Sequence, residues 1–598
     1  MKHLSNEDEL EKTKFINGRE QQHVHLDFSR SVDQTRLGRW KKLRLILLVG
    51  FLVGWTLLIA TVVIMVLTPK HPFRPDLKWY DKNIVYEILP ESFQDSSVKD
   101  VHTKKGDGVG DLKGILARLD YLKDIGSKVL YINSIYESND EDHKAIVNHT
   151  KIDEIYGSME DFVELRKVTK EMKMRLIMDF IPNHTGKQNQ WFSKSQKKEG
   201  KYTDYFIWTT CDPQTYRHDL MVIGRGAWTY DDTRKECYFH QLESDKPDLN
   251  LRSADVRQEL ESILRFWLDK GVDGFHVQDQ HLYEDEILGN ETFVNGKTDS
   301  EHQDLNRSDD MNHAKLLKAW KTVLESYNTK PGREKALIVT AKDDLNTTKE
   351  YFDAGVTIVR VTPLSVSGAS LAESNTSLAE RIETKLKNAN SNFKKIGWMY
   401  GDKYSSRLTN SLVGPVQIKV LLTLQATLPG VPFNYYGNEI GMTDHLTLSA
   451  PKKYRTPMQW NSKGTGFSQN TPWVDRNANY ITINVETEKA TGDEYTTLKV
   501  YKRLQELREN ESFQWGTMSV YRDGDLLMYT RKADGFPGYL VAINLGTSRV
   551  TGSFHAATGI PKEIKVVFHT HKDDNSAISL SDTSYILNPS HAVVLEYQ

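Results

Sequence analysis

The chain contains one apolar run that differs from the sequence around it. Residues 45–67 read LILLVGFLVGWTLLIATVVIMVL and contain no charged side chain. A helix of roughly 20 apolar residues is long enough to cross the hydrocarbon core of a bilayer. A cleavable signal peptide would begin near residue 1 and have a shorter apolar core. The pattern therefore predicts one transmembrane helix over residues 44–68, preceded by a polar, disordered tail at residues 1–43.

The charges flanking this run predict its orientation. The N-terminal flank is strongly basic: Arg30, Arg36, Arg39, Lys41, Lys42 and Arg44. On the other side, Lys70 and Arg74 are interspersed with prolines and Asp76. Because an excess of positive charge close to a span stays in the cytoplasm, the N-terminus is expected to be cytoplasmic. The chain is then a type II single-pass protein of the plasma membrane, with residues 69 onward outside the cell.

After the span, short apolar segments alternate with amphipathic ones. The β-prone runs are residues 84–89, 129–132, 176–181, 274–277, 337–340 and 356–361, and the helical patterns are 112–124, 159–171, 254–270 and 312–327. Apolar strands alternating with amphipathic helices are typical of parallel βα units, and so many in series predict an α/β fold with a (β/α)8 TIM barrel over residues 69–494. Alternating β-prone runs at 526–529, 539–544 and 592–597 predict a small antiparallel C-terminal β domain over residues 495–598.

The composition indicates the class of protein, and the cysteines bear on its compartment. The chain has 598 residues, 38% of them hydrophobic, and a net charge of −3, which is typical of a globular protein and gives no reason to expect nucleic acid as a partner. Cys211 and Cys237 are its two cysteines, and outside the cell such a pair predicts a disulfide. Acceptor patterns for N-glycosylation occur at Asn148, Asn290, Asn306, Asn346, Asn375 and Asn510.

Five motifs give the barrel a family resemblance. They are residues 106–114 (GDGVGDLKG), 179–185 (DFIPNHT), 271–275 (GVDGF), 436–442 (YGNEIGM) and 455–460 (RTPMQW). In this order they resemble glycoside hydrolase family 13, in its maltase and oligo-glucosidase branch. The resemblance implies an inserted B domain at about residues 187–250, which holds both cysteines.

The catalytic positions of that family are not filled by carboxylates here. A retaining glycosidase needs a carboxylate nucleophile and a carboxylic acid about 5 Å apart. The resemblance places the nucleophile at Gln278, the acid at Ala341 and the third carboxylate at Tyr404. The sequence therefore predicts a protein that is not an enzyme. The alternative is a shifted register with Asp279 and Asp343 as the catalytic pair, which requires the same kind of offset at two separate strands.

The resemblance also implies a calcium site. In the family an Asn, an Asp and nearby carbonyls hold the ion near the B domain, and such hard oxygen ligands suit Ca²⁺. The matching positions are Asn183 and Asp248, with Asp285 as a further carboxylate and Leu282 and Tyr283 as carbonyl donors. If Asn183 is a calcium ligand, it is buried and not glycosylated. The alternative is that its side chain only forms hydrogen bonds with neighbouring loops. Asp179 and His184 are expected to stabilise the strand end rather than bind sugar.

An inactive family-13 barrel on one N-terminal span resembles the heavy chains of heteromeric amino-acid transporters, in the rBAT-like branch that keeps the B domain. The resemblance implies an ancillary subunit that stabilises a multi-span light chain and brings it to the plasma membrane, with two heterodimers able to pair. Gly50 and Gly54 form a small-residue face for helix packing. No cysteine lies between Thr68 and Trp79, so no covalent bridge to the light chain is expected.

Two other classes of function remain open at this stage. A membrane-anchored α-glucosidase would release glucose from maltose, and a receptor would use the pocket to bind sugar without cleaving it. An assay for glucose release distinguishes the first of these from the ancillary subunit.

Overall fold

The computed structural model describes two compact units, residues 1–71 and 72–598. The described residues are 34–67, 72–96, 107–211, 221–222, 225–226, 228–278, 311–340, 345–361, 377–388, 395–410, 418–572 and 584–598. In the first unit these residues form one helix, α1 (Gln34–Leu67), of which Gly38–Met65 is long and apolar enough to cross a membrane. The helix begins before the predicted residue 44 because the Leu, Arg and Lys residues ahead of the apolar run are good helix formers.

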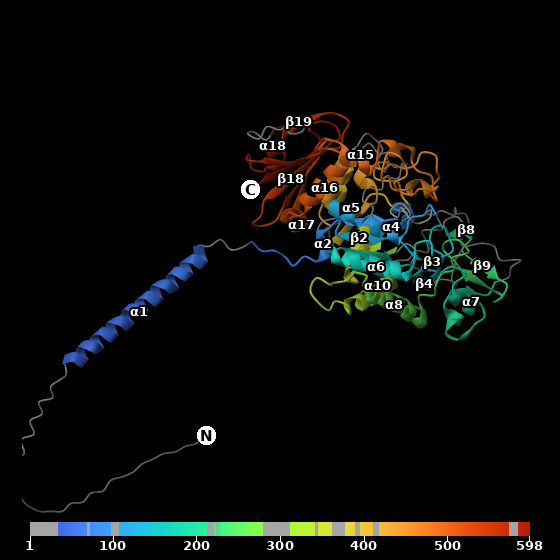
Figure 1. The fold of residues 1–598 in the computed structure, drawn as a ribbon, viewed down its shortest axis with the longest axis horizontal. Coiled ribbons are helices and arrows are strands. Elements are labelled where there is room, and N and C mark those ends of the chain that lie inside the picture. The colour runs from blue at the N-terminus through green and yellow to red at the C-terminus, as the bar shows by residue number, and fades with distance from the viewer. Residues whose placement is uncertain are drawn as a thin grey trace, which may run out of the picture. The chain divides into compact units, whose positions relative to one another are not determined.

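The second unit is built on a closed parallel barrel of eight strands (Figure 1). The strands, in chain order, are β1 (Val85–Ile88), β2 (Val129–Ile132), β5 (Arg175–Asp179), β11 (Gly274–Gln278), β12 (Ala336–Thr340), β13 (Ile358–Val361), β14 (Ile396–Met399) and β15 (Val431–Tyr435). Strand β15 closes the barrel by pairing with β1. The predicted TIM barrel is confirmed, and each of the six predicted apolar runs supplies one of its strands.

Apolar side chains fill the barrel, and helices cover it. Alternate strand residues such as Val85, Ile177, Ile338 and Phe433 form one buried cluster in the lumen, as the layered packing of such barrels requires. The described covering helices are α4 (Leu112–Ala117), α5 (Leu119–Asp124), α6 (Met159–Glu171), α8 (Ala254–Asp269), α10 (Met311–Glu325), α11 (Leu345–Asp353), α13 (Leu378–Asn388) and α14 (Ile418–Thr427). This packing leaves the polar residues at the carboxyl ends of the strands to form the site.

A small β-rich segment follows β5 and precedes α8. It contains α7 (Gln190–Gln196) and an antiparallel sheet of β6 (Trp208–Thr209), β10 (Glu236–Phe239) and β9 (Trp228–Asp231). The predicted disulfide is present between Cys211 and Cys237, with Cα atoms 5.8 Å apart. Cys237 packs with Trp228 and Phe239 in a separate apolar cluster. The disulfide therefore links β10 to the residues that follow β6 and stabilises this small sheet, which has little apolar core of its own.

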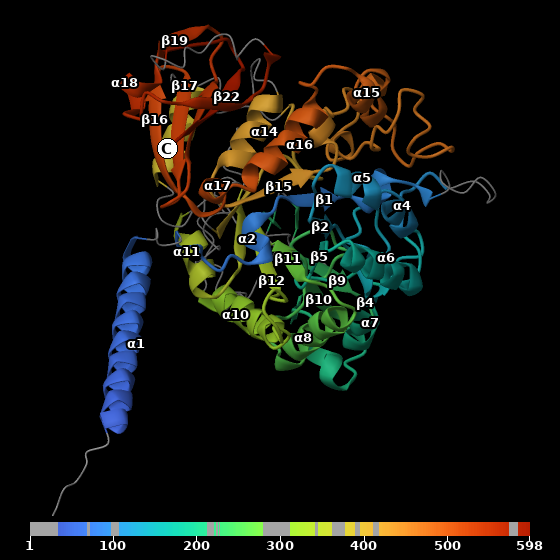
Figure 2. The same cartoon turned by 60° about the vertical axis from the view of Figure 1, so that its left-hand side comes forward.

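The C-terminal part is a five-stranded antiparallel sheet, as predicted. Its order is β16 (Thr517–Asp523), β17 (Leu526–Lys532), β18 (Gly538–Asn544), β22 (Ala592–Tyr597) and β20 (Lys565–His569). The sheet lies beside α16 (Thr497–Arg508) in both views (Figures 1 and 2), and its strand β18 contacts α14. Buried side chains from the barrel and the sheet belong to one continuous core, so the two parts are packed as one body.

Candidate functional site

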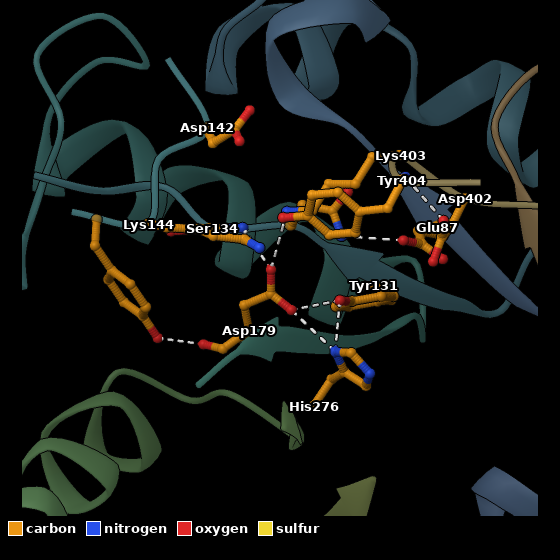
Figure 3. Close-up of polar contacts among 12 residues, drawn as sticks. Glu87, Tyr131, Ser134, Asp142, Lys144, Asp179, His276, Asp402, Lys403 and Tyr404 are labelled. Atoms are coloured by element: carbon orange, nitrogen blue, oxygen red, sulfur yellow. Dashed lines mark hydrogen bonds and ion pairs between the residues drawn. The ribbon is translucent and has the colours of Figure 1, made fainter. Parts of the chain in front are cut away.

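A small pocket of about 30 Å³ lies at the carboxyl ends of barrel strands. Residues 179–184, from the last residue of β5 onward, form one wall, and His276 of β11 contributes from the neighbouring strand. Lys403 and Tyr404, which follow β14, and Lys144 complete the lining. Active sites of TIM-barrel proteins occupy this face, so the pocket is the candidate functional site (Figure 3).

Asp179 is the centre of the polar network, as Figure 3 shows. Its Oδ1 accepts hydrogen bonds from the Tyr131 hydroxyl and from His276 Nδ1, the latter at 3.0 Å. Its Oδ2 accepts from the Ser134 main-chain N–H at 2.9 Å and lies 3.5 Å from Lys403 Nζ. Burial opposes ionisation, but Lys403 and the hydrogen bonds outweigh it and hold the pKa of the Asp179 carboxyl well below its usual range. Both carboxylate oxygens of Asp179 are therefore already bonded by protein groups.

His276 is locked in the same network. Its Nδ1 contacts Asp179 and the Tyr131 hydroxyl, and its Nε2 lies 2.6 Å from Oγ1 of Thr340 on the next strand. Burial lowers the pKa of the imidazole, which favours a neutral ring that donates from Nδ1 to the carboxylate and accepts from the threonine hydroxyl. The ring therefore links β5, β11 and β12; that Asp179 stabilises the strand end rather than binding sugar stays a prediction.

A second buried ion pair lies inside the barrel. Arg360 of β13 bonds Glu87 of β1 across the barrel, and Asn133 donates to the other oxygen of Glu87 at 3.1 Å. Both charged side chains are 2% exposed. Burial raises the pKa of Glu87 even though Arg360 opposes that shift. The pair fills the space between strands and offers no free carboxylate to the pocket.

The pairing of β11 with β12 is described up to Gln278 and Thr340. It begins with Gly274 opposite Ala336. Ala341, Asp279 and Asp343 lie outside the described residues. Among the described lining residues Asp179 is the one acid, whereas retaining hydrolysis needs two carboxylates about 5 Å apart.

Two of the five predicted calcium ligands lie close together. An isolated bridge pairs His184 with Asp248, and Leu249 N donates to the Asn183 carbonyl at 2.8 Å. Asp248 is buried, and both its oxygens accept hydrogen bonds from Gln241. Burial raises its pKa to about 7. A buried carboxylate beside an Asn amide fits one side of a hard-cation site. In this structure Gln241 donates hydrogen bonds to both oxygens of that carboxylate. The other predicted ligands, Leu282, Tyr283 and Asp285, lie outside the described residues.

The remaining predicted positions differ in exposure. Asn148 is exposed, Asn510 is half-buried, and Asn183 is buried, as expected for an unglycosylated position. Asn346 lies in α11, while Asn290, Asn306 and Asn375 fall outside the described residues. At Gly50 and Gly54 an added Cβ would meet nothing within 4 Å, so this face of α1 is open.

Three residues of the site were not predicted from the sequence: Lys144 and Lys403, which line the pocket, and Tyr131, which donates to Asp179. Tyr131 reads as one more β-prone residue of the run VLYI, and the lysines lie in loops whose patterns have no fixed spacing. Their contacts join parts of the chain that only barrel closure brings together. The one sequence signal that could have pointed to this network was Tyr131, a tyrosine at a strand position that faces into the barrel.

The barrel, its inserted segment and the C-terminal sheet define the class of protein. Residues 87–516 match the family described as alpha amylase, catalytic domain. The isomaltulose synthase SmuA from Protaminobacter rubrum superposes with a TM-score of 0.74 at 24% identity, covering 88% of this chain and all of that one; at this identity the likeness concerns the fold alone.

Two curated relatives extend the comparison beyond the barrel. The human amino acid transporter heavy chain SLC3A1 is 33% identical over 582 residues, which cover 90% of this chain and 80% of that protein. The salivary alpha-glucosidase of Aedes aegypti is 28% identical and covers 87% of this chain and 95% of its own length. The chain therefore belongs to the alpha-amylase family and, within it, to the group of SLC3A1-like heavy chains.

Proposed function

We propose that this chain is the catalytically inactive heavy subunit of a heteromeric amino-acid transporter. It crosses the plasma membrane once through α1, with the N-terminus in the cytoplasm and the barrel outside. It stabilises a multi-span light chain and brings it to the cell surface. The observation that carries this proposal is the 33% identity to SLC3A1, which runs through 90% of the chain.

The pocket supports the inactive state. The carboxylate of Asp179 is the one acidic group among the described lining residues, and the protein itself bonds both of its oxygens. Covalent and acid catalysis each contribute orders of magnitude in rate and need carboxylates free to reach the sugar. A single apolar helix cannot enclose a solute pathway, so the light chain carries the transport.

The second candidate is a membrane-anchored α-glucosidase. The observation that favours it is the similarity to insect enzymes, which covers 87% of the chain for the Aedes aegypti alpha-glucosidase. Under this alternative Asp279 and Asp343 supply the catalytic pair. The purified protein would then release nitrophenol from a nitrophenyl α-glucoside, and Asp279→Asn would abolish that release.

One pair of measurements separates the two candidates. The full-length chain is purified in mild detergent, its co-purifying proteins are identified, and the same sample is assayed with maltose and a nitrophenyl glucoside. We expect a multi-span transporter to co-purify and no turnover above background. Appreciable turnover abolished by Asp279→Asn, without a co-purifying transporter, contradicts the proposal.

The transmembrane face offers a matched control for this experiment. Replacing both Gly50 and Gly54 by leucine fills the open face of α1 and is expected to reduce recovery of the light chain. Gly38→Leu, in the same helix but outside the apolar run, should leave recovery unchanged. Equal recovery with both variants removes this face from the interface.

We also propose that Ca²⁺ binds beside the inserted segment, with Asn183 and Asp248 as two of its ligands and Leu282, Tyr283 and Asp285 as the others. The ion would neutralise the buried Asp248 carboxylate and fix the junction of barrel and segment. Added Ca²⁺ should raise the melting temperature of the wild type relative to EGTA, and Asp248→Asn should abolish that rise. Asp232→Asn, at a position 92% exposed, is the control; no Ca²⁺-dependent shift in the wild type refutes the site.

A further inference from the structure

A short charged connection borders the pocket. Residues 140–144 (DEDHK) join β3 (Tyr136–Ser138) to β4 (Ile146–Ile152), and we call them the strap. Lys144, at the end of the strap, lines the pocket. The pocket of about 30 Å³ has room for about two water molecules, because each needs roughly 10–15 Å³. Solutes as large as a sugar are therefore excluded while the strap is in this position.

Each acid of the strap pairs with a cation from another part of the chain. The pairs are Asp140 with Lys246 at 3.2 Å, Glu141 with Lys452 at 2.8 Å and Asp142 with Arg455 at 2.5 Å. Lys246 belongs to the inserted segment between β5 and α8, whereas Lys452 and Arg455 follow β15. The strap is therefore tied at once to two segments that are far apart in the sequence.

The three pairs differ in strength. Asp140 and Lys246 are both buried, so this pair anchors the start of the strap. The side chain of Glu141 is 76% exposed, and exposed ion pairs contribute little. Asp142 pairs with the buried Arg455. Loss of the Asp142 pair is thus the change that frees the Lys144 end of the strap.

Asp142 lies among several cations. Burial opposes its ionisation, but Arg455, with Lys144 and Lys403 nearby, outweighs burial and holds the pKa of the Asp142 carboxyl below its usual value. Arg455 Nε also donates to the Lys403 carbonyl at 2.9 Å. The middle of the strap is therefore attached to the loop after β14, which supplies Lys403 to the pocket lining.

The end of the strap meets the opposite side of the pocket. Lys144 Nζ lies 4.2 Å from the centre of the Tyr404 ring (Figure 3), and both residues line the pocket. The face of an aromatic ring attracts a cation. This contact joins the strap to the loop after β14 across the pocket.

The backbone of the strap is strained at His143. Its φ of 51° lies in the left-handed region, which is disfavoured for residues that have a Cβ. The surroundings hold it there: His143 Nδ1 lies 2.8 Å from Ser138 Oγ, and its ring lies 5.0 Å from that of Tyr156. Such strain persists only where neighbouring contacts maintain it, so opening of the strap would release it.

We propose that the strap is a latch over the barrel pocket, which it seals when the Asp142–Arg455 pair is formed and opens to small solutes when that pair is released. Opening separates Lys144 from Tyr404 and removes one side of the pocket. The buried Asp140–Lys246 pair keeps the strap attached, so opening is a local event that leaves the fold intact. The proposal concerns the pocket alone and does not depend on a light chain.

The accessibility of a thiol in the pocket tests the latch. Ile181 is half-buried and lines the pocket, and Ile181→Cys adds one free thiol to a chain whose two cysteines are bonded. Its modification by methyl methanethiosulfonate is timed in the full-length protein in detergent. Asp142→Asn should speed this reaction at least roughly tenfold, because the rate follows the population of the open form. An unchanged rate in a folded Asp142→Asn protein overturns the proposal.

Two controls separate opening of the strap from general loosening. Glu137→Gln, on β3 of the same hairpin, removes an acid that pairs with Lys151 at 2.6 Å and should leave the rate unchanged. The thiol of Ile481→Cys, at a position 61% exposed, should react equally fast with and without Asp142→Asn. If Asp142→Asn accelerates both thiols to the same extent, the assignment to the strap is wrong.

Hydrogen exchange tests the latch without any substitution. The N–H groups of Lys144 and Ala145 donate to Asp140 Oδ1 at 2.9 and 2.7 Å. In the wild-type chain we expect these amides to exchange faster than those of barrel strand β5, because the strap opens locally. High salt should accelerate them further by screening the exposed charges. Strap amides that exchange as slowly as those of β5 at both low and high salt overturn the proposal.

Discussion

At the scale of single residues, Glu439 is an unusual buried acid. It is fully buried and accepts hydrogen bonds from the hydroxyls of Tyr86 at 2.7 Å and Tyr121 at 2.8 Å. Asn434 Nδ2 lies 3.4 Å from its other oxygen. Burial raises the pKa of this carboxyl, although the hydrogen bonds oppose the shift. The folded protein therefore binds the Glu439 proton more tightly than the unfolded chain does.

This difference predicts a pH-dependent stability. Because the folded-state pKa lies above the unfolded value, the stabilisation is complete below about pH 4 and is lost as the pH rises through the raised pKa. Each unit of pKa difference corresponds to about 1.4 kcal/mol. Glu439→Gln removes the titration, and Oδ1 of Asn434, which has no hydrogen-bond partner in the described chain, can turn to accept from the new amide. The variant should therefore gain stability relative to the wild type as the pH rises from 4 to 8.

Urea midpoints at several pH values measure this effect. Glu563→Gln, at an exposed position of the C-terminal part, is the control and should follow the wild type. A constant difference between Glu439→Gln and the wild type across this range would show that Glu439 is ionised in both states, contrary to the prediction.

At the scale of elements, two buried arginines join the C-terminal sheet to the barrel. Arg531 of β17 donates to the carbonyls of Thr427 at 2.7 Å and Phe513 at 2.9 Å. Arg508 of α16 donates to the carbonyl of Ala426 at 2.6 Å. Thr427 ends α14, and the last carbonyls of a helix lack intrahelical donors and carry partial negative charge. Arg531 of β17 and Arg508 of α16 supply the hydrogen-bond donors that these carbonyl groups lack.

Replacing Arg531 tests this junction. Arg531→Met leaves buried carbonyls without donors, each at a cost of roughly 1–3 kcal/mol, so the free energy of unfolding should fall by about 3 kcal/mol. Arg522→Met is the matched control on the neighbouring strand, because Arg522 makes a partly exposed pair with Glu383 at 2.7 Å, and exposed ion pairs contribute little to stability. Equal urea midpoints for the two variants would refute the role of Arg531.

The elements also show what a pattern can predict. Strands such as β5 and β11 were predicted because parallel strands buried on both faces read as continuous apolar runs. Strands β14 and β15 were not among the predicted runs, since Gly397 and Pro432 interrupt their β signal. The network around Asp179 was equally hidden, because Tyr131 lies 48 residues before it and only the closed barrel makes them neighbours. Positions in a motif can be predicted, but their partners across the barrel cannot.

At the scale of the whole molecule, Asn148 tests the proposed topology. Its exposed side chain accepts hydrogen bonds from Thr150 N at 2.9 Å and Thr150 Oγ1 at 2.8 Å. If the barrel is outside the cell, this position should carry a glycan. Asn148→Gln and Thr150→Ala should each increase electrophoretic mobility by one glycan, and Thr150→Ser, which keeps the acceptor pattern, should not. Identical mobility of all variants before and after glycosidase treatment would contradict the proposed orientation.

The Cys211–Cys237 bridge has a consequence for how long an assembled complex lasts. Both sulfur atoms of the chain's two cysteines are used inside one small sheet, so under the proposed function we expect the light chain to be held by noncovalent contacts. Such a pair is in equilibrium with its separated subunits, and its lifetime is set by the dissociation rate. If the proposed function holds, we therefore expect the heavy chain to exchange between light chains in the membrane, in proportions set by the abundance of each light chain.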